Sequence, residues 1–166
     1  MPPRDQMDHD SLRETVSLLL DGGRAHARAR DVLAGFPKQR GERPSGFAHS
    51  AWQLLEHLRI AQDDILDFCV NAAYEHTRQW PDDYWPRDPE PPAGHAWTDS
   101  IASFGRSREA LKRIARDEEN LTAAVPTGTG SQTYLRAILL AADHAAYHVG
   151  QLVAVRRALG IWPAAR

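Results

Sequence analysis

Three histidines are the residues whose types and spacing are best suited to chemistry. His144 and His148 lie four residues apart in DHAAYHVGQL (143–152). In a helix this spacing returns to nearly the same face, about 40° further round. His57 lies in SAWQLLEHLRIA (50–61), at a position of an apolar helical stripe where leucine would be expected. Three imidazoles directed into one helical core indicate a divalent metal site, because burying them without a partner is costly.

The three histidines are expected to bind zinc or nickel. Neutral imidazole is the commonest protein ligand for zinc and also suits nickel, copper and iron. Three histidines leave one coordination position for water or a substrate, as in catalytic rather than structural zinc sites. Spacing alone leaves a second interpretation open, in which they are core histidines without a metal. Surface or ordinary core positions are expected for the other histidines: His9, His26, His49, His76 and His95.

Three further side chains are candidates for a pocket or for supporting the ligands. Gln151 follows His148 by three residues and is placed to hydrogen-bond a ligand, a water or an imidazole. Asp64 follows His57 by seven residues, on the same helical face two turns away, although a solvated carboxylate is the simpler expectation. Tyr147 either lines a pocket or packs between helices. The sequence identifies no catalytic residue.

Composition restricts the classes of protein to consider. The chain has 166 residues, which suits one domain spanning 1–166. A formal net charge of −2 argues against a nucleic-acid partner. No apolar signal core and no run approaching about 18 apolar residues is found, so no membrane partner is expected. Cys69 is the only cysteine, which excludes an internal disulfide. We expect a soluble cytoplasmic protein.

The apolar pattern predicts an all-α fold of four long helices. The first runs from about Ser11 to about Gly35, and Ser11 has capping-box spacing with Glu14. The Asp21-Gly22-Gly23 segment is expected to kink or split this helix, since each interior glycine costs about 1 kcal/mol. The second helix starts at the N-cap Ser50, with Gln53 placed for the reciprocal capping bond, and ends near residues 76–78.

The last two helices complete the bundle. The third begins after Thr98 and ends near Glu118. The fourth begins at the N-cap Ser131, and Gly160 is placed to follow its last residue. Gly150 lies inside the fourth helix and suggests a close helix approach or access to the site.

A proline-rich connection separates the second and third helices. The stretch from Gln79 to Gly94, QWPDDYWPRDPEPPAG, contains five prolines and cannot be helical. In a bundle it would carry the chain from one end to the other, which gives an up-down-down-up four-helix bundle. Aromatic side chains are expected to pack this crossover onto the bundle, or to wall a pocket that selects an aromatic or hydrophobic acceptor: Trp80, Tyr84, Trp85 and the nearby Trp97.

These segments resemble the DinB/YfiT superfamily of metal-binding four-helix bundles. The HxxxH-x-GQL pattern at 144–152 carries most of the resemblance, followed by the helical histidine after W-x-L-L-x at 52–57. The segment LLLDGGRAHARARDVLAGFP (18–37) is similar to the first helix of one bacterial branch. The resemblance covers most of the chain, and it implies a three-histidine metal site at the mouth of the bundle, matching His57, His144 and His148.

The resemblance also suggests an activity. The superfamily includes thiol S-transferases that use bacillithiol or mycothiol, and a thiol-dependent isomerase. It implies a metal-dependent thiol S-transferase or hydrolase, in which the bound metal activates a low-molecular-weight thiol or a water. A homodimer is expected, as in many relatives. The alternative is a non-catalytic stress-response or interaction protein with a structural or incidental metal. A ferritin-like di-iron oxidase is disfavoured, because its Glu-x-x-His motifs do not occur near these histidines.

Overall fold

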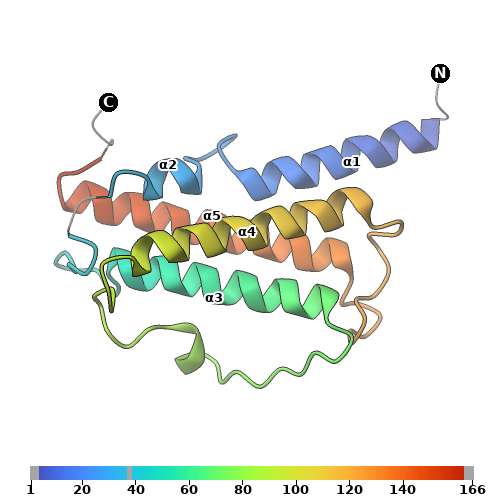
Figure 1. The fold of residues 1–166 in the computed structure, drawn as a ribbon. Coiled ribbons are helices and arrows are strands. Elements are labelled where there is room, and N and C mark those ends of the chain that lie inside the picture. Colours follow the sequence, from blue (N-terminus) through green and yellow to red (C-terminus); the bar gives the residue numbers. More distant parts are fainter. Residues whose placement is uncertain (1–3, 37–38, 163–166) are drawn as a thin grey trace.

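The protein is a bundle of four long helices in a computed structural model that describes residues 4–36 and 39–162 (Figure 1). Over these residues it is all-helical, so the predicted all-α class is confirmed. The elements are α1 (Arg4–Asp21), α2 (Ala29–Leu33), α3 (Ala51–Val70), the short 3₁₀ helix η1 (Asp82–Tyr84), α4 (Ala96–Asp117) and α5 (Tyr134–Ala158).

The topology follows from the long connection between α3 and α4. Figure 1 shows α3 and α4 running in the same direction, with α1 and α5 running in the opposite one. The crossover returns along the outside of the bundle, from the end of α3 to the start of α4. The up-down-down-up arrangement therefore matches the prediction. In this arrangement α3 packs against both α4 and α5.

The first predicted helix is split in two. Gly22 and Gly23 adopt φ values of +66° and +82°, in the left-handed region that favours glycine, and the helix ends just before them. The predicted start at Ser11 is wrong, since α1 already begins at Arg4. Ser11 lies inside the helix, and its carbonyl accepts a hydrogen bond from the Thr15 hydroxyl at 2.8 Å.

The start of α3 is as predicted, but its end is not. The Ser50 hydroxyl accepts from the Gln53 amide, and the Gln53 side chain accepts from the Ser50 amide, which confirms the capping box. The helix ends at Val70 rather than near residues 76–78. Asn71 ends it by adopting an extended conformation and accepting a hydrogen bond from the Ala73 amide.

Helix α4 begins three residues earlier than predicted and ends at Asp117, next to the predicted Glu118. Helix α5 starts later than predicted. Thr133, not Ser131, is the N-cap of α5, and its hydroxyl accepts from the Arg136 amide at 3.2 Å. Gly160 follows the end of α5 with φ +70°, as predicted. By length and composition α5 is apolar enough to cross a membrane, but the central helix of a bundle has the same character. Here α5 packs against α1, α2, α3 and α4.

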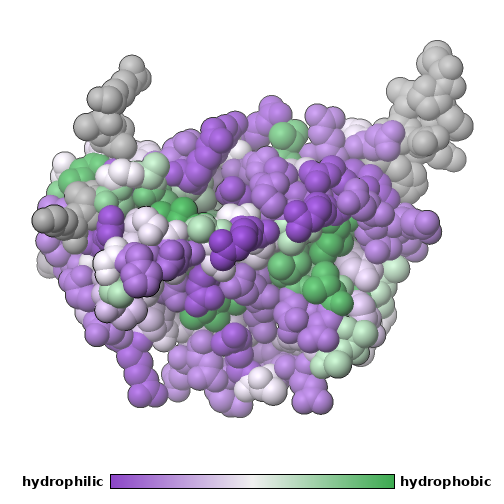
Figure 2. Space-filling model, viewed as in Figure 1, coloured by the Kyte–Doolittle hydropathy of each residue, from purple (hydrophilic) through white to green (hydrophobic). Residues whose placement is uncertain are grey.

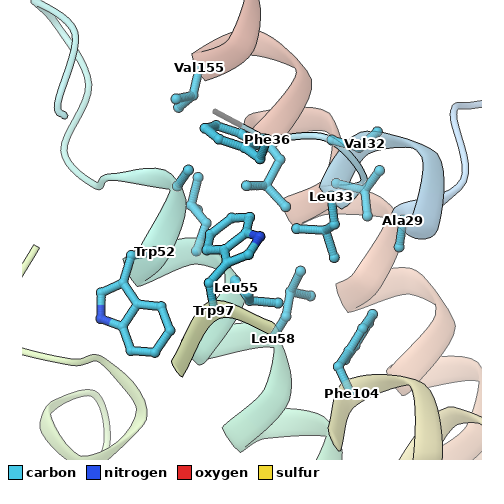
Figure 3. Packing of buried hydrophobic residues seen from close by; sticks show 14 residues of the cluster. Ala29, Val32, Leu33, Phe36, Trp52, Leu55, Leu58, Trp97, Phe104 and Val155 are labelled. Atoms are coloured by element: carbon cyan, nitrogen blue, oxygen red, sulfur yellow. The ribbon is translucent and has the colours of Figure 1, made fainter. Parts of the chain in front are cut away.

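The core is formed by two hydrophobic clusters along the bundle. The cluster nearer α2 includes Trp97 of α4, which lies among Leu33, Leu55 and Leu58 in Figure 3. Phe36 packs against Trp97 with ring centroids 5.1 Å apart. Figure 2 shows a mostly hydrophilic outer face with smaller hydrophobic areas. This packed end of the bundle supports the part of α3 that carries His57.

A buried arginine fixes α2 to the end of α5. Arg156 is 1% exposed, and its guanidinium donates to the carbonyls of Val32, Ala34 and Ile161. The guanidinium also lies 4.9 Å from the ring centroid of Phe36. The charge is thus satisfied by backbone carbonyls that follow the ends of α2 and α5 or lie in the last turn of α2, where carbonyls lack partners within the helix.

Candidate metal centre

The three predicted histidines converge between α3 and α5. One ligand nitrogen from each of His57, His144 and His148 lies within 4.8 Å of the others. The Nε2 atoms of His57 and His144 are 3.0 Å apart. His57 is 1% exposed and His148 is 6% exposed, while His144 is partly exposed. The four-residue spacing places His144 and His148 one turn apart on the face of α5 that packs against α3.

Hydrogen bonds fix the orientation of two imidazole rings. Nδ1 of His57 donates to the Tyr84 carbonyl at 3.0 Å. Nδ1 of His148 donates to the side-chain oxygen of Gln151 at 2.7 Å. Since both acceptors are carbonyl oxygens, the proton of each neutral ring is held on Nδ1 and the lone pair is left on Nε2. Partners of this kind set the tautomer and orientation of metal-binding histidines.

The geometry of the cluster fits a bound cation. The unprotonated Nε2 of His57 faces Nε2 of His144, and two lone pairs at 3.0 Å repel unless a proton or a metal lies between them. Two imidazole nitrogens on one tetrahedral zinc are about 3.3 Å apart, from Zn–N distances of about 2.05 Å. A separation of 3.0 Å also fits a hydrogen bond in which Nε2–H of His144 donates to Nε2 of His57. Together with His148, the pair is a set of imidazole donors that could hold a metal.

Burial keeps the cluster uncharged near neutral pH. Desolvation, followed by repulsion from the neighbouring histidines, lowers the pKa of both His57 and His144 to about 4. Burial also lowers the pKa of His148. Metal ligation requires the neutral imidazole, so protons compete weakly for these nitrogens at pH 7.

Trp85 of the crossover forms one wall of the cluster. Its ring stacks on His57 with centroids 3.7 Å apart and an interplanar angle of 4°. His49 stacks on the same indole at 3.8 Å and 13°. Two nearly parallel imidazoles at these distances must lie on opposite faces of Trp85, since they would clash on one face. The indole is thus held between them and fixes the plane of the His57 ring.

The first residues of α3 anchor the crossover. The Ser50 hydroxyl donates to the Pro89 carbonyl at 2.6 Å, and the Gln53 side chain donates to the Pro86 carbonyl at 2.9 Å. The capping box therefore starts the helix that carries His57 and also holds the loop that carries Trp85.

Asp64 and Tyr147 lie near the cluster in different environments. Asp64 accepts hydrogen bonds from the hydroxyls of Tyr84 at 2.6 Å and Tyr74 at 3.2 Å, so the expected solvated carboxylate is wrong. Burial and the Asp64 carboxylate raise the pKa of Tyr84, which keeps its phenol protonated as the donor. Tyr147 is 64% exposed and lies edge-on to His148, with centroids 4.8 Å apart.

Sequence reasoning missed several residues of this centre. The contribution of Tyr84 to His57 comes from a backbone carbonyl, which has no sequence signature. His49 was assigned to an ordinary position, but it stacks on Trp85. The aromatic residues of the crossover were the feature of the sequence that could have indicated this stacked wall beside the histidines. Tyr84 and Trp97 are buried as expected, whereas Trp80 is 69% exposed and lines a pocket beside His144, which is the other role expected for these aromatic residues.

Comparison with known proteins identifies the family. The sequence model of the DinB superfamily matches residues 23–152, a span of 130 of the 166 residues that includes all three histidines. Searches of curated proteins and of solved structures gave no significant match. The family match covers more than half of the sequence and agrees with the all-helical fold, so the chain belongs to the DinB superfamily.

Proposed function

We propose that His57, His144 and His148 hold a divalent metal, zinc or nickel, and that the protein is a metal-dependent thiol S-transferase or hydrolase. The observation that carries the proposal is the convergence of three largely buried imidazoles, two with Nδ1 committed to carbonyl acceptors. Membership of a metal-binding superfamily supports it. When bound, a divalent metal would lower the pKa of a water to about 7, or hold a thiol as its thiolate.

The chain's own residues would prepare the site for such chemistry. Tyr84 and Gln151 orient the imidazoles, and Trp85 covers one side of the cluster. The partial exposure of His144 leaves an approach from solvent for a substrate. The positions of the rings are thus set before a substrate arrives, which avoids the cost of ordering them later.

The nucleophilic thiol would come from a small molecule. Cys69 is 1% exposed, and burial raises the pKa of its thiol to about 12. A buried thiol of this kind is protonated at neutral pH and out of reach of a substrate. An external thiol, or a water for the hydrolase, is therefore the reactant that this proposal requires.

Metal content tests the site. Untagged protein purified without chelator is expected to contain about one zinc or nickel per chain by elemental mass spectrometry. The His57→Ala and His148→Ala variants should each lose it, while His95→Ala, with a side chain 77% exposed, should retain it. Full metal affinity in His148→Ala, or wild-type protein that refuses added zinc and nickel, would reject the proposed site.

A panel of small thiols and electrophiles then tests the activity. Metal-loaded protein should give S-conjugates, or hydrolysis of an ester panel, above the rate of His57→Ala. Metal binding with no turnover for any thiol or ester would favour the alternative, a non-catalytic metal-binding protein of stress response or interaction.

A further inference from the structure

A pocket of about 250 Å³ opens beside His144, between α3, α5 and the crossover. Apolar groups form most of its wall: Ala61 and Ile65 of α3, Leu140 of α5, and Trp80 and Tyr84 of the crossover. Leu140 lies one turn before His144 on α5, so the pocket leads directly to the histidine cluster. Any molecule held here would present one end to the proposed metal.

Two large apolar side chains of this pocket face solvent. Trp80 is 69% exposed and Leu140 is 47% exposed. One exposed leucine carries no meaning alone, because much of any protein surface is apolar. Here two such side chains from different segments line the same pocket, next to a candidate ligand. The ring of Trp80 is tilted against Tyr84, at a centroid distance of 5.4 Å, which leaves its remaining surface to contact a bound group.

The charges around the pocket are already balanced. Asp64 and His76 also line the pocket. Asp64 accepts from two tyrosine hydroxyls, and its carboxylate lies 3.8 Å from Nε of Arg78 and 3.9 Å from Nδ1 of His76. An ion that entered the pocket would lose water among apolar side chains and would find these charges already paired. An uncharged group loses little by the same transfer and gains the burial of its apolar surface.

We propose that this pocket binds an uncharged apolar group of about the size of one substituted aromatic ring, and that Trp80 and Leu140 determine the specificity for it. A cavity of about 150 Å³ is enough to hold benzene, so 250 Å³ holds a ring with a short substituent. As a statement about substrate class, the inference rests on the proposed function. The pocket's capacity to bind such a group does not.

Three probes of equal size test the preference for an uncharged group. Benzyl alcohol, benzylamine and benzoate share one ring, and at pH 7.5 they are neutral, cationic and anionic. Metal-free protein is used, so that no probe can be held by a metal through its amine or carboxylate. Titrations followed by NMR chemical shifts should give benzyl alcohol at least tenfold tighter binding than either ion. Equal or tighter binding of an ion overturns the inference.

Adjacent leucines provide a matched pair of variants. Leu139 and Leu140 are both exposed on α5, at 40% and 47%, but Leu140 is the one that lines the pocket. Leu140→Ser should weaken benzyl alcohol binding about tenfold, and Leu139→Ser should leave it unchanged. Trp80→Ala should weaken it similarly, with partial recovery in Trp80→Phe. Equal affinities in Leu139→Ser and Leu140→Ser would remove the pocket from consideration.

Cobalt loading separates this inference from the proposed function. If Co²⁺ binds the histidines and benzyl alcohol binds beside them, the metal should enhance relaxation of the probe's ring protons. Failure to load cobalt, with Leu140-dependent binding intact, would reject the metal site and keep the pocket. If cobalt loads and Leu140→Ser binds benzyl alcohol as tightly as the wild type, the pocket is rejected and the metal site is kept.

Discussion

At the scale of single residues, the site depends on which ring nitrogen carries the proton. Tyr84 and Gln151 hold the proton of His57 and His148 on Nδ1, which leaves the lone pair of each ring on Nε2. The three histidines could be predicted because their spacing places them on inward faces. The Tyr84 carbonyl could not, since any residue at that position supplies the same group.

Removing the acceptor from Gln151 should weaken metal binding. Gln151→Leu is expected to lower the affinity for zinc by about 10- to 100-fold, because the His148 ring loses the partner that fixes its tautomer. Gln151→Glu keeps an acceptor and should retain most of the affinity. Competition with a chromophoric chelator measures both. Equal affinities for the leucine variant and the wild type would show that the hydrogen bond has no such role.

The lowered pKa values of His57 and His144 predict that acid destabilises the metal-free protein. Unfolding returns each pKa from about 4 to 6.5, so the unfolded state binds more protons in that range. The stabilisation is complete above pH 6.5 and is lost as the pH falls toward 4. As the pH falls through this range, each histidine should lower the free energy of unfolding by up to about 3 kcal/mol. Urea unfolding between pH 7.5 and 4.5 tests this.

A variant identifies the source of that pH dependence. His144→Leu removes one titrating group and should give a shallower fall in unfolding free energy over the same pH range. His95→Ala, at a position 77% exposed and outside the cluster, is the control for replacing a histidine. An unchanged slope in His144→Leu would assign the acid sensitivity to other groups.

At the scale of helices, boundaries depend on local side-chain chemistry more than on the apolar pattern. The α3 capping box was predictable because Ser50 and Gln53 have the required types and spacing. The end of α3 was not, because the apolar pattern continues past Asn71, whose side chain turns the backbone out of the helix. The start of α5 was also decided by a local side-chain hydrogen bond, because the Thr133 hydroxyl caps the helix where Ser131 was expected to do so.

Two glycines near the end of α5 should respond to alanine in opposite ways. Gly150 is helical and exposed, and a Cβ there would meet no atom within 4 Å, so the suggested close helix approach is wrong. Gly150→Ala should stabilise the protein by about 1 kcal/mol. Gly160 adopts φ +70°, so Gly160→Ala should destabilise the protein by about 1 kcal/mol. Thermal unfolding compares them, and destabilisation by Gly150→Ala would contradict this view.

At the scale of the whole molecule, the arrangement of the helices was predictable because the prolines between 79 and 94 exclude a helix there. The detailed path of the crossover could not be predicted, since it depends on side-chain hydrogen bonds from α3 and its N-cap to backbone carbonyls of the loop. The exposed position of Trp80 shows the limit of the pattern, because an aromatic residue in such a loop suggests packing but does not specify it.

We expect the protein to form a homodimer through exposed apolar helix faces. Leu12 and Leu19 lie two turns apart on α1 and are 40% and 48% exposed, so both would lose apolar surface to water on pairing. Light scattering at micromolar concentration should give about twice the 18.6 kDa of one chain. The Leu12→Glu/Leu19→Glu double variant should shift the mass toward that of the monomer. A monomeric wild type would exclude the homodimer.

The anchoring of the crossover has a consequence for how this site can evolve. Its later half is tied to α3 through Pro86 and Pro89 and to His57 through Tyr84, so mutations there disturb the ligands. Trp80, at the start of the same loop, lines the pocket with a side chain that is 69% exposed, and it holds none of the ligands by a hydrogen bond. Selection can therefore exchange the residue at position 80, and with it the group that the pocket prefers, while the histidine cluster is inherited unchanged.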